Sequence, residues 1–293
     1  MKRSTSFIAV AGICAVLAVA LLMCIAQDKS AKPARADFVP SPEFSPPYPP
    51  LPHHFGKTHG IQILCQAPKG AIKRALARPL EQSGDDDRFV LLMGWSPECE
   101  GYNVHEIAIN APVKWNNKVG NTTLIEYIDS DMGLITGREV WGWAKKMADI
   151  VWTQTATGWT VTCNTMKDQN SVPLMKVEYK ISNSTPTVQW PNMGPTLLVK
   201  RIPYASLSVP PLTQLVCIGC NRPPSSGSIP AMPSGDKGKG TKGFATVQFF
   251  DGPHDPLTFL GPIKVLDAKM SITEGSTTTG GLGLGEVIYE WKE

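Results

Sequence analysis

The chain has 293 residues, with 42% hydrophobic and 18% charged residues, which is the composition of a folded protein and excludes a disordered one. The formal net charge of +3 comes from the first 36 residues, which carry five basic residues and one acidic residue. The remainder has 28 − 5 = 23 basic and 25 − 1 = 24 acidic residues, so it is nearly neutral. Such a body has no overall field to attract nucleic acid, and no nucleic acid partner is expected.

Residues 1–36 have the features of a targeting segment. Lys2 and Arg3 precede an uncharged, mostly apolar run over residues 7–26, and a polar stretch then ends in an Ala-x-Ala pattern at residues 34–36. About 20 apolar residues can also span a bilayer, so a cleaved signal peptide and an N-terminal membrane anchor both stay open. Either one predicts a secreted or membrane-anchored, non-cytosolic protein, with membrane association through residues 7–26 in the second case.

Residues 37–52 are rich in proline and are expected to form a stiff linker or a packed arm. Residues 53–293 read as one domain of short runs rich in Val, Ile, Thr and aromatic residues, separated by Gly, Pro and Asn, and their close spacing predicts a mainly antiparallel sheet or barrel. Helix signals are few; the clearest covers 69–81, and 227–243 is expected to be an exposed loop. The strand-like runs are 61–66, 88–95, 104–115, 123–129, 158–166, 175–182 and 245–250.

Seven cysteines are present, two of them in the apolar N-terminal run. An odd number outside the cytosol suggests one or two disulfides and a leftover thiol. Cys217 and Cys220 form a single CxxC without a second pair at zinc spacing, so a disulfide or a pair of buried thiols is favoured over zinc, and no metal site is predicted. The other cysteines of the body are Cys65, Cys99 and Cys163.

Two adjacent lysines, Lys145 and Lys146, stand in the aromatic and apolar stretch GREVWGWAKKMAD over residues 137–149. Desolvation and a neighbouring cation both disfavour an ammonium, and a neutral lysine amine can form a Schiff base with a ketone or aldehyde. The protonated imine then accepts electrons from a carbon that loses CO2 or a proton. The alternative is that the two lysines form a solvated turn.

The stretch 137–149 resembles the Gly-Arg-Glu-(x)4-Pro-Lys-Lys-(apolar) signature of the acetoacetate decarboxylase family, the usual example of a lysine activated by a cationic neighbour. The segments KGAIKRALARPLE, GYNVHEIAINAPVKW and VTCNTM, and the C-terminal strands, are similar to further family motifs in the same order. The resemblance extends from about Pro49 to Trp291. It implies an α+β fold with a mainly antiparallel, β-barrel-like or cone-like core and few helices, and a homo-oligomer.

The resemblance also implies roles for three residues. Lys145 would form the Schiff base, Lys146 would help keep its pKa low, and Glu106 would position the substrate or handle a proton. The substrate would be a keto acid or a related carbonyl compound, and no cofactor would be needed, because the lysine itself provides the electron sink. Arg138 and Glu139 would form an internal ion pair that holds the lysine segment, in preference to contacting substrate.

The chain departs from the family pattern at three positions. Thr58 stands where the family has an arginine placed to meet the substrate carboxylate, although Lys57 or His59 lies close by in sequence. Val90 replaces a second glutamate, and Ala144 replaces the proline before the lysines. Buried polar groups dominate discrimination among substrates, so these losses point to a different ligand. The alternative function is a non-catalytic or differently catalytic small-molecule-binding protein that retains the fold and its cavity.

Overall fold

A computed structural model describes residues 41–42, 44–51, 53–166, 170–182, 188–220, 240–273, 276–277 and 285–292. Residues 41–293 group into one compact unit, separate from residues 1–40. The expected signal peptide or membrane anchor at residues 1–36 lies outside the described residues. Within the described ranges, no helix is both long enough and apolar enough to cross a membrane.

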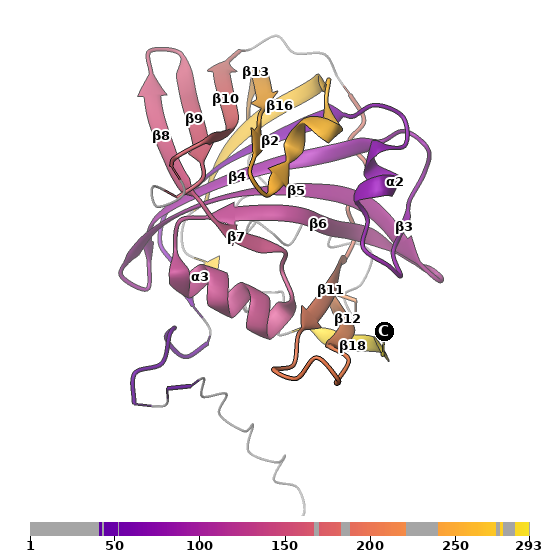
Figure 1. The fold of residues 1–293 in the computed structure, drawn as a ribbon. Coiled ribbons are helices and arrows are strands. Elements are labelled where there is room, and N and C mark those ends of the chain that lie inside the picture. The colour runs from indigo at the N-terminus through magenta and orange to yellow at the C-terminus, as the bar shows by residue number, and fades with distance from the viewer. Residues whose placement is uncertain are drawn as a thin grey trace, which may run out of the picture. The chain divides into compact units, whose positions relative to one another are not determined.

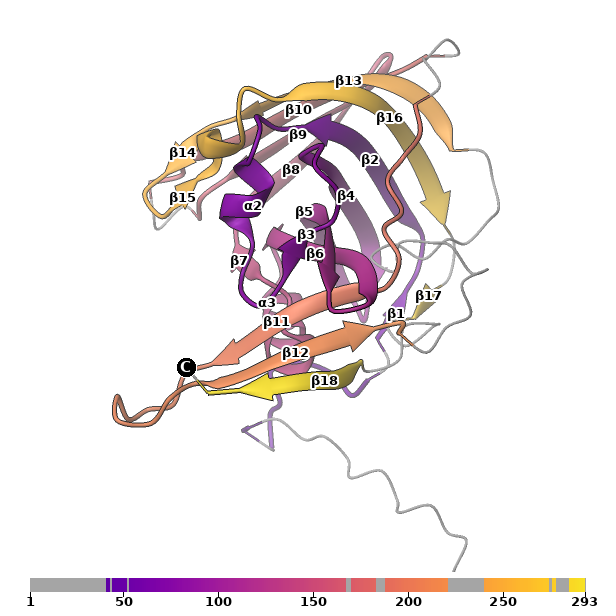
Figure 2. The same ribbon diagram turned by 90° about the vertical axis from the view of Figure 1, so that its right-hand side faces the viewer.

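The body is built on one large, strongly curved sheet (Figure 1). Its strands follow the order β18-β12-β11-β6-β5-β4-β2-β16-β13-β10-β9-β8, and within the described residues all pairs are antiparallel except β6–β11 and β6–β7. The end strands β18 and β8 are not paired in this order, so the sheet curls without closing, and Figure 2 shows β13, β16, β2 and β4 arching around one side. The predicted mainly antiparallel fold with few helices is confirmed.

The strands have the following bounds: β1 His54–Phe55, β2 Thr58–Gln66, β3 Glu81–Gln82, β4 Arg88–Cys99, β5 Tyr102–Trp115, β6 Lys118–Ile128, β7 Lys145–Met147, β8 Asp149–Thr155, β9 Gly158–Asn164, β10 Pro173–Ile181, β11 Thr196–Ile202, β12 Leu212–Ile218, β13 Thr241–Phe249, β14 Asp251–Gly252, β15 Asp255–Pro256, β16 Lys264–Thr273, β17 Ser276–Thr277 and β18 Glu286–Trp291. Each of the seven strand-like runs of the sequence falls on one of these strands. The helical elements are α2 Ala71–Ala75, α3 Asp131–Thr136, the π-helix η1 Gly137–Trp141 and the 3-10 helix η4 Leu257–Leu260.

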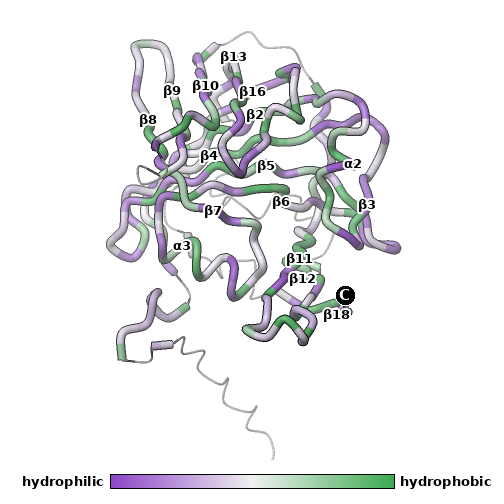
Figure 3. Tube along the Cα trace, in the orientation of Figure 1, coloured by the Kyte–Doolittle hydropathy of each residue, from purple (hydrophilic) through white to green (hydrophobic). Residues whose placement is uncertain are grey.

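The two faces of the sheet differ in what they bury. Side chains alternate between the faces of a strand, and the odd-numbered positions of β2 and β4, such as Ile61, Ile63, Phe89 and Leu91, form the main hydrophobic core. Figure 3 shows the hydrophobic segments running along β4, β5 and β6. The opposite face carries small apolar clusters, such as Leu92 with Ala108, and several buried polar groups. The candidate site lies on this second face.

The helix predicted over 69–81 is much shorter in the structure. The carboxylate of Asp87 accepts hydrogen bonds from the backbone N–H groups of Gly70 and Ile72 and so fixes the start of α2. At Leu76 the backbone is already extended, and a turn at residues 78–79 then leads to Leu80, which is buried in a separate cluster. Burial of Leu80 thus prevails over the helical propensity of the second half of this segment. In the expected loop at 227–243, β13 already begins at Thr241, and residues 227–239 lie outside the described residues.

The proline-rich segment packs against the body. Tyr48 is 3% exposed and lies in a cluster with Cys99, Val104, Ile128 and Met132. Its burial raises the pKa of the phenol to about 12. Tyr48 thus attaches the described part of this segment to the body.

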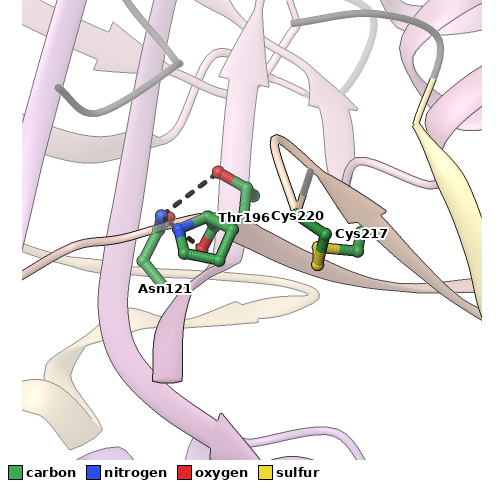
Figure 4. The surroundings of a disulfide bond; sticks show 5 residues. Asn121, Thr196, Cys217 and Cys220 are labelled. Carbon is green, nitrogen blue, oxygen red and sulfur yellow. Dashed lines mark hydrogen bonds between the residues drawn. A yellow bond between two sulfur atoms is a disulfide. The ribbon is translucent and has the colours of Figure 1, made fainter. Parts of the chain in front are cut away.

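Strands β11, β12 and β18 join the rest of the sheet through a short junction on β6. The buried side chain of Asn121 donates hydrogen bonds to the carbonyl of Met193 at 2.8 Å and to the hydroxyl of Thr196 at 3.1 Å. Figure 4 shows this junction near the disulfide between Cys217 and Cys220, at the end of β12. Of the two alternatives favoured for the CxxC pair, the structure has the disulfide. The three other cysteines of the body are buried thiols.

Candidate active site

The register of three strands brings the site together. Strand β7 pairs parallel with β6, so that Lys145 lies opposite Glu126 and Lys146 opposite Tyr127. Glu126 lies opposite Ala108 of β5. Glu106 is two residues before Ala108 and therefore points to the same face. Lys145, Glu126 and Glu106 thus share one face, while Lys146 points to the other.

The segment before β7 is shaped around the lysine. Ser130 caps α3 by accepting a hydrogen bond from the N–H of Gly133, and α3 continues into the π-helix η1, an element that is frequent at functional sites. A Cβ atom added at Gly137 would lie 2.5 Å from Cε and 2.7 Å from Cδ of Lys145, so only glycine leaves room for the lysine stem there. The helix ends at Gly142, whose φ of 85° is in the left-handed region that favours glycine.

Lys145 is almost fully buried, and its amine contacts two carboxylates. Its Nζ lies 2.8 Å from Oε1 of Glu126 and 3.5 Å from Oε2 of Glu106. Burial by itself lowers the pKa of the ammonium, but the charges and hydrogen bonds of Glu126 and Glu106 outweigh burial, and the pKa is raised. The expectation that the pKa of Lys145 is kept low is therefore wrong for this state of the protein.

Lys146 does not act on Lys145 as expected. Its Nζ donates hydrogen bonds to Oδ1 of Asp255 at 2.6 Å and to the carbonyl of His254 at 3.2 Å, and the hydroxyl of Tyr127 donates to the same Asp255 oxygen at 2.7 Å. Because adjacent residues of a strand point to opposite faces, the charge of Lys146 is neutralised on the far side of β7. The prediction that Lys146 lowers the pKa of Lys145 is therefore corrected. Lys146 instead attaches the β14–β15 hairpin to β7.

Glu126 is a residue of the site that the sequence analysis missed. Burial, together with the nearby Glu106, raises its pKa to about 7, although the charge of Lys145 acts in the opposite direction. Its position in the run TLIEYID carried a usable signal, because a glutamate there interrupts a mostly apolar, strand-like run that is expected to be buried. Glutamate is almost never fully buried without a partner.

Two of the three positions that depart from the family pattern, Thr58 and Val90, lie on the face of Lys145. Thr58 is buried, and its hydroxyl is 2.8 Å from that of Ser96 on β4. Val90 packs with Leu64 and Met193. His59 points to the other face, where its ring stacks on Trp95 with a centroid separation of 4.8 Å, so it does not replace the missing arginine.

Arg138 holds the lysine segment, but not through the expected ion pair. Its guanidinium donates a hydrogen bond to the carbonyl of Lys145 at 3.0 Å. No salt bridge to Glu139 is found in the part of the chain that the structure describes. The backbone on either side of Lys145 is fixed as well, because the N–H of Glu126 donates to the carbonyl of Ala144 at 2.9 Å. Within the described ranges, no group of three or more His, Cys, Asp or Glu residues is arranged to hold a metal ion.

The site as a whole is a buried lysine amine held between two carboxylates on one face of a curved, mainly antiparallel sheet. The family model described as acetoacetate decarboxylase (ADC) matches residues 38–289, and the chain belongs to this family. The family resemblance drawn from the sequence is thereby confirmed.

Individual relatives are distant. Acetoacetate decarboxylase of Chromobacterium violaceum is 29% identical over 106 residues, which are 36% of this chain and 42% of the relative, so the match spans about two fifths of that protein. A solved acetoacetate decarboxylase structure aligns with a TM-score of 0.66 at 18% identity, over 87% of this chain and 97% of the other. The enduracididine biosynthesis enzyme MppR, solved with the condensation product of pyruvate and imidazole 4-carboxaldehyde, aligns with a TM-score of 0.62 at 15% identity over 88% and 97%. At these identities the structures establish the fold.

Proposed function

We propose that the protein is an imine-forming lyase that acts on a keto acid or a related carbonyl compound through Lys145. The observation that carries the proposal is the position of this lysine: it is buried in a chain of the acetoacetate decarboxylase family, with its amine between Glu126 and Glu106. The family contains decarboxylases, and MppR, which shares the fold, was solved with a condensation product of pyruvate. Both relationships support carbonyl chemistry at this site.

The reaction begins with a proton transfer, because an ammonium cannot attack a carbonyl. Glu126 contacts the amine, and its pKa is raised to about 7, so it is the group best placed to accept the proton of Lys145. The neutral amine then adds to the carbonyl carbon, water leaves, and a protonated imine forms. Electrons of a neighbouring C–C or C–H bond flow into this imine, and Glu106, with a quarter of its side chain exposed, is placed to exchange a proton with the product.

Trapping with cyanoborohydride tests this function. The protein is incubated with acetoacetate, pyruvate and a panel of ketones and aldehydes, reduced, and digested for mass spectrometry. We expect an adduct on Lys145, its loss in Lys145→Arg, and its retention in Lys114→Arg, which changes an exposed lysine on β5. Absence of any adduct on Lys145 would refute the imine chemistry.

A binding protein that retains the fold without catalysis is the second candidate. The observation in its favour is the raised pKa of Lys145, since an ammonium held by two carboxylates is unreactive until it loses a proton. The same experiment separates the two functions. Saturable binding of a carbonyl compound without a trapped adduct would identify a binding protein.

A further inference from the structure

We propose that the carbonyl compound that reacts at Lys145 is uncharged, an aldehyde or ketone without a carboxylate of its own. This inference rests on the proposed function, which leaves the charge of the substrate open. It follows from which charged side chains face the amine and which do not.

The charges that meet at the site are one cation and two carboxylates. Lys145 contacts Glu126 at 2.8 Å and Glu106 at 3.5 Å, and the side chains of both Lys145 and Glu126 are more than nine-tenths buried. Charges this close interact strongly because the buried site is poorly screened by water. The cluster is neutral when Glu126 is protonated and net negative when both glutamates are ionised, so in neither state does it offer a net positive charge to a substrate.

The described cations around this cluster are directed elsewhere, and Lys57, the residue before Thr58, is exposed with its charge acting on His59. Lys146 is bound to Asp255 on the opposite face of β7, and the guanidinium of Arg138 donates to a backbone carbonyl. His59 lies on the opposite face of β2. In place of a cation, the face of Lys145 offers the hydroxyls of Thr58 and Ser96, which hydrogen-bond to each other, and the methyl groups of Val90. These groups suit a neutral, partly apolar molecule.

The charge balance of the reaction agrees with a neutral substrate. Lys145 as an ammonium and a neutral carbonyl compound give a protonated imine and water, so the positive charge stays on the same nitrogen, opposite the same two carboxylates. Glu126 takes one proton when the amine is released and returns it when water leaves, and no proton is gained or lost overall. A substrate carboxylate would add a further negative charge to this cluster, and among the described residues no cation other than Lys145 itself is seen to contact it, which is unfavourable in a buried site.

A matched pair of carbonyl compounds tests this inference. Pyruvate and methyl pyruvate differ in the charge of the carboxyl group and in one added methyl group, and neither needs to lose CO2 to be trapped. Cyanoborohydride labelling of Lys145 is followed by mass spectrometry, and each rate is divided by the rate for Nα-acetyl-lysine in the same solution, which removes the different intrinsic reactivity of acid and ester. We expect the ester to label Lys145 at least tenfold faster than the acid after this correction.

A variant pair then assigns the selectivity to the site. Glu106→Gln removes one carboxylate with little change of shape and is expected to lower the ester-to-acid ratio at least threefold. Glu81→Gln, on an exposed side chain of β3, is expected to leave the ratio unchanged. Equal or faster labelling by pyruvate in the wild-type protein overturns the inference while leaving the imine chemistry intact. Failure of both compounds to label Lys145 overturns the inference and, with a negative panel, the proposed function as well.

Discussion

At the scale of single residues, the charge state of Lys145 is governed by carboxylates rather than by a neighbouring lysine. A buried ammonium is stable only when opposite charges compensate for lost hydration, and Glu126 and Glu106 do so here. In the proposed reaction, the same contacts that stabilise the ammonium would also provide its proton acceptor, because Glu126 touches the amine.

Glu126 should leave a signature in the pH dependence of stability. Its folded-state pKa of about 7 lies above the ordinary value of 4.5, so between these pH values the folded protein holds a proton that the unfolded chain has lost. The free energy of unfolding therefore decreases as pH rises through this window, by at most about 1.4 kcal/mol per pH unit. Glu126→Gln is neutral at every pH and should lack this decrease.

Urea unfolding between pH 4.5 and 8 gives the free energy of unfolding of the wild type and of Glu126→Gln. The difference between the two values at each pH measures the effect. Glu81→Gln serves as the control, because its carboxylate is exposed and paired only with Lys114 at the surface. Parallel pH profiles for wild type and Glu126→Gln would contradict the raised pKa of Glu126.

Gly137 should matter for reactivity more than for stability. Its φ of −59° and ψ of −45° suit alanine, and replacing glycine in a helical segment by alanine usually stabilises by about 0.5–1 kcal/mol. The added Cβ would nevertheless displace the stem of Lys145, which lies 2.5 Å away at Cε. We expect Gly137→Ala to slow trapping at Lys145 at least tenfold while the thermal midpoint changes by only a few degrees.

Glu139→Ala, on an exposed residue of the same π-helix, is the matched control and should keep the wild-type trapping rate. If Gly137→Ala reacted as fast as wild type, the close packing of Gly137 on the lysine would have no functional consequence.

At the scale of elements, β7 is a three-residue strand with a different role on each face. One face presents Lys145 to the site, and the other attaches the β14–β15 hairpin through Lys146, Tyr127 and Asp255. The adjacent lysines of the sequence are therefore separated by the alternation of the strand. Lys145 could be singled out as the candidate imine-forming residue from the family motif. The partner of Lys146 could not be predicted, because Asp255 is 109 residues away in sequence.

Lys146 and Tyr127 should be coupled in stability. Both donate to the same oxygen of Asp255, which is almost fully buried, so removing either donor leaves the carboxylate with fewer partners. We expect Lys146→Met to lower the free energy of unfolding by about 1–2 kcal/mol and Tyr127→Phe by about 1 kcal/mol, and we expect the double variant to deviate from additivity. Urea unfolding of the four proteins measures the coupling.

Trapping at Lys145 provides the second measurement on Lys146→Met. A structural role predicts labelling within about twofold of wild type. A loss of labelling with little loss of stability would instead restore Lys146 to the catalytic role that the family resemblance implies.

At the scale of the whole molecule, the fold could be predicted because apolar and polar side chains alternate along each strand. The partners in the site could not be predicted, because they depend on which strands pair across the sheet. Runs such as 88–95 and 104–115 become neighbouring strands because each buries one face, and this pattern is local. Glu126 becomes a partner of Lys145 only through the parallel β6–β7 pairing, which no local pattern specifies. Likewise, the helix predicted over 69–81 is cut short by Leu80, which packs with Val113, Leu197 and Leu215 of distant strands.

The buried thiols report on how cooperatively this body unfolds. Cys65 and Cys163 lie in the main core and Cys99 lies beneath the proline-rich arm, and all three are free and buried. Burial raises the pKa of Cys65 and Cys99 to about 12 and also raises that of Cys163, so little thiolate is present at neutral pH. We expect none of the three to react with iodoacetamide in the native protein, and all three to react over the same range of urea concentration.

Peptide mass spectrometry of protein labelled at increasing urea concentration resolves each cysteine separately. Cys217 and Cys220 provide the internal reference, because their disulfide blocks alkylation until a reductant is added. If the packed arm and the core form one cooperative unit, Cys99 becomes reactive together with Cys65. Labelling of Cys99 at a lower urea concentration than Cys65 and Cys163 would instead show that the arm detaches first.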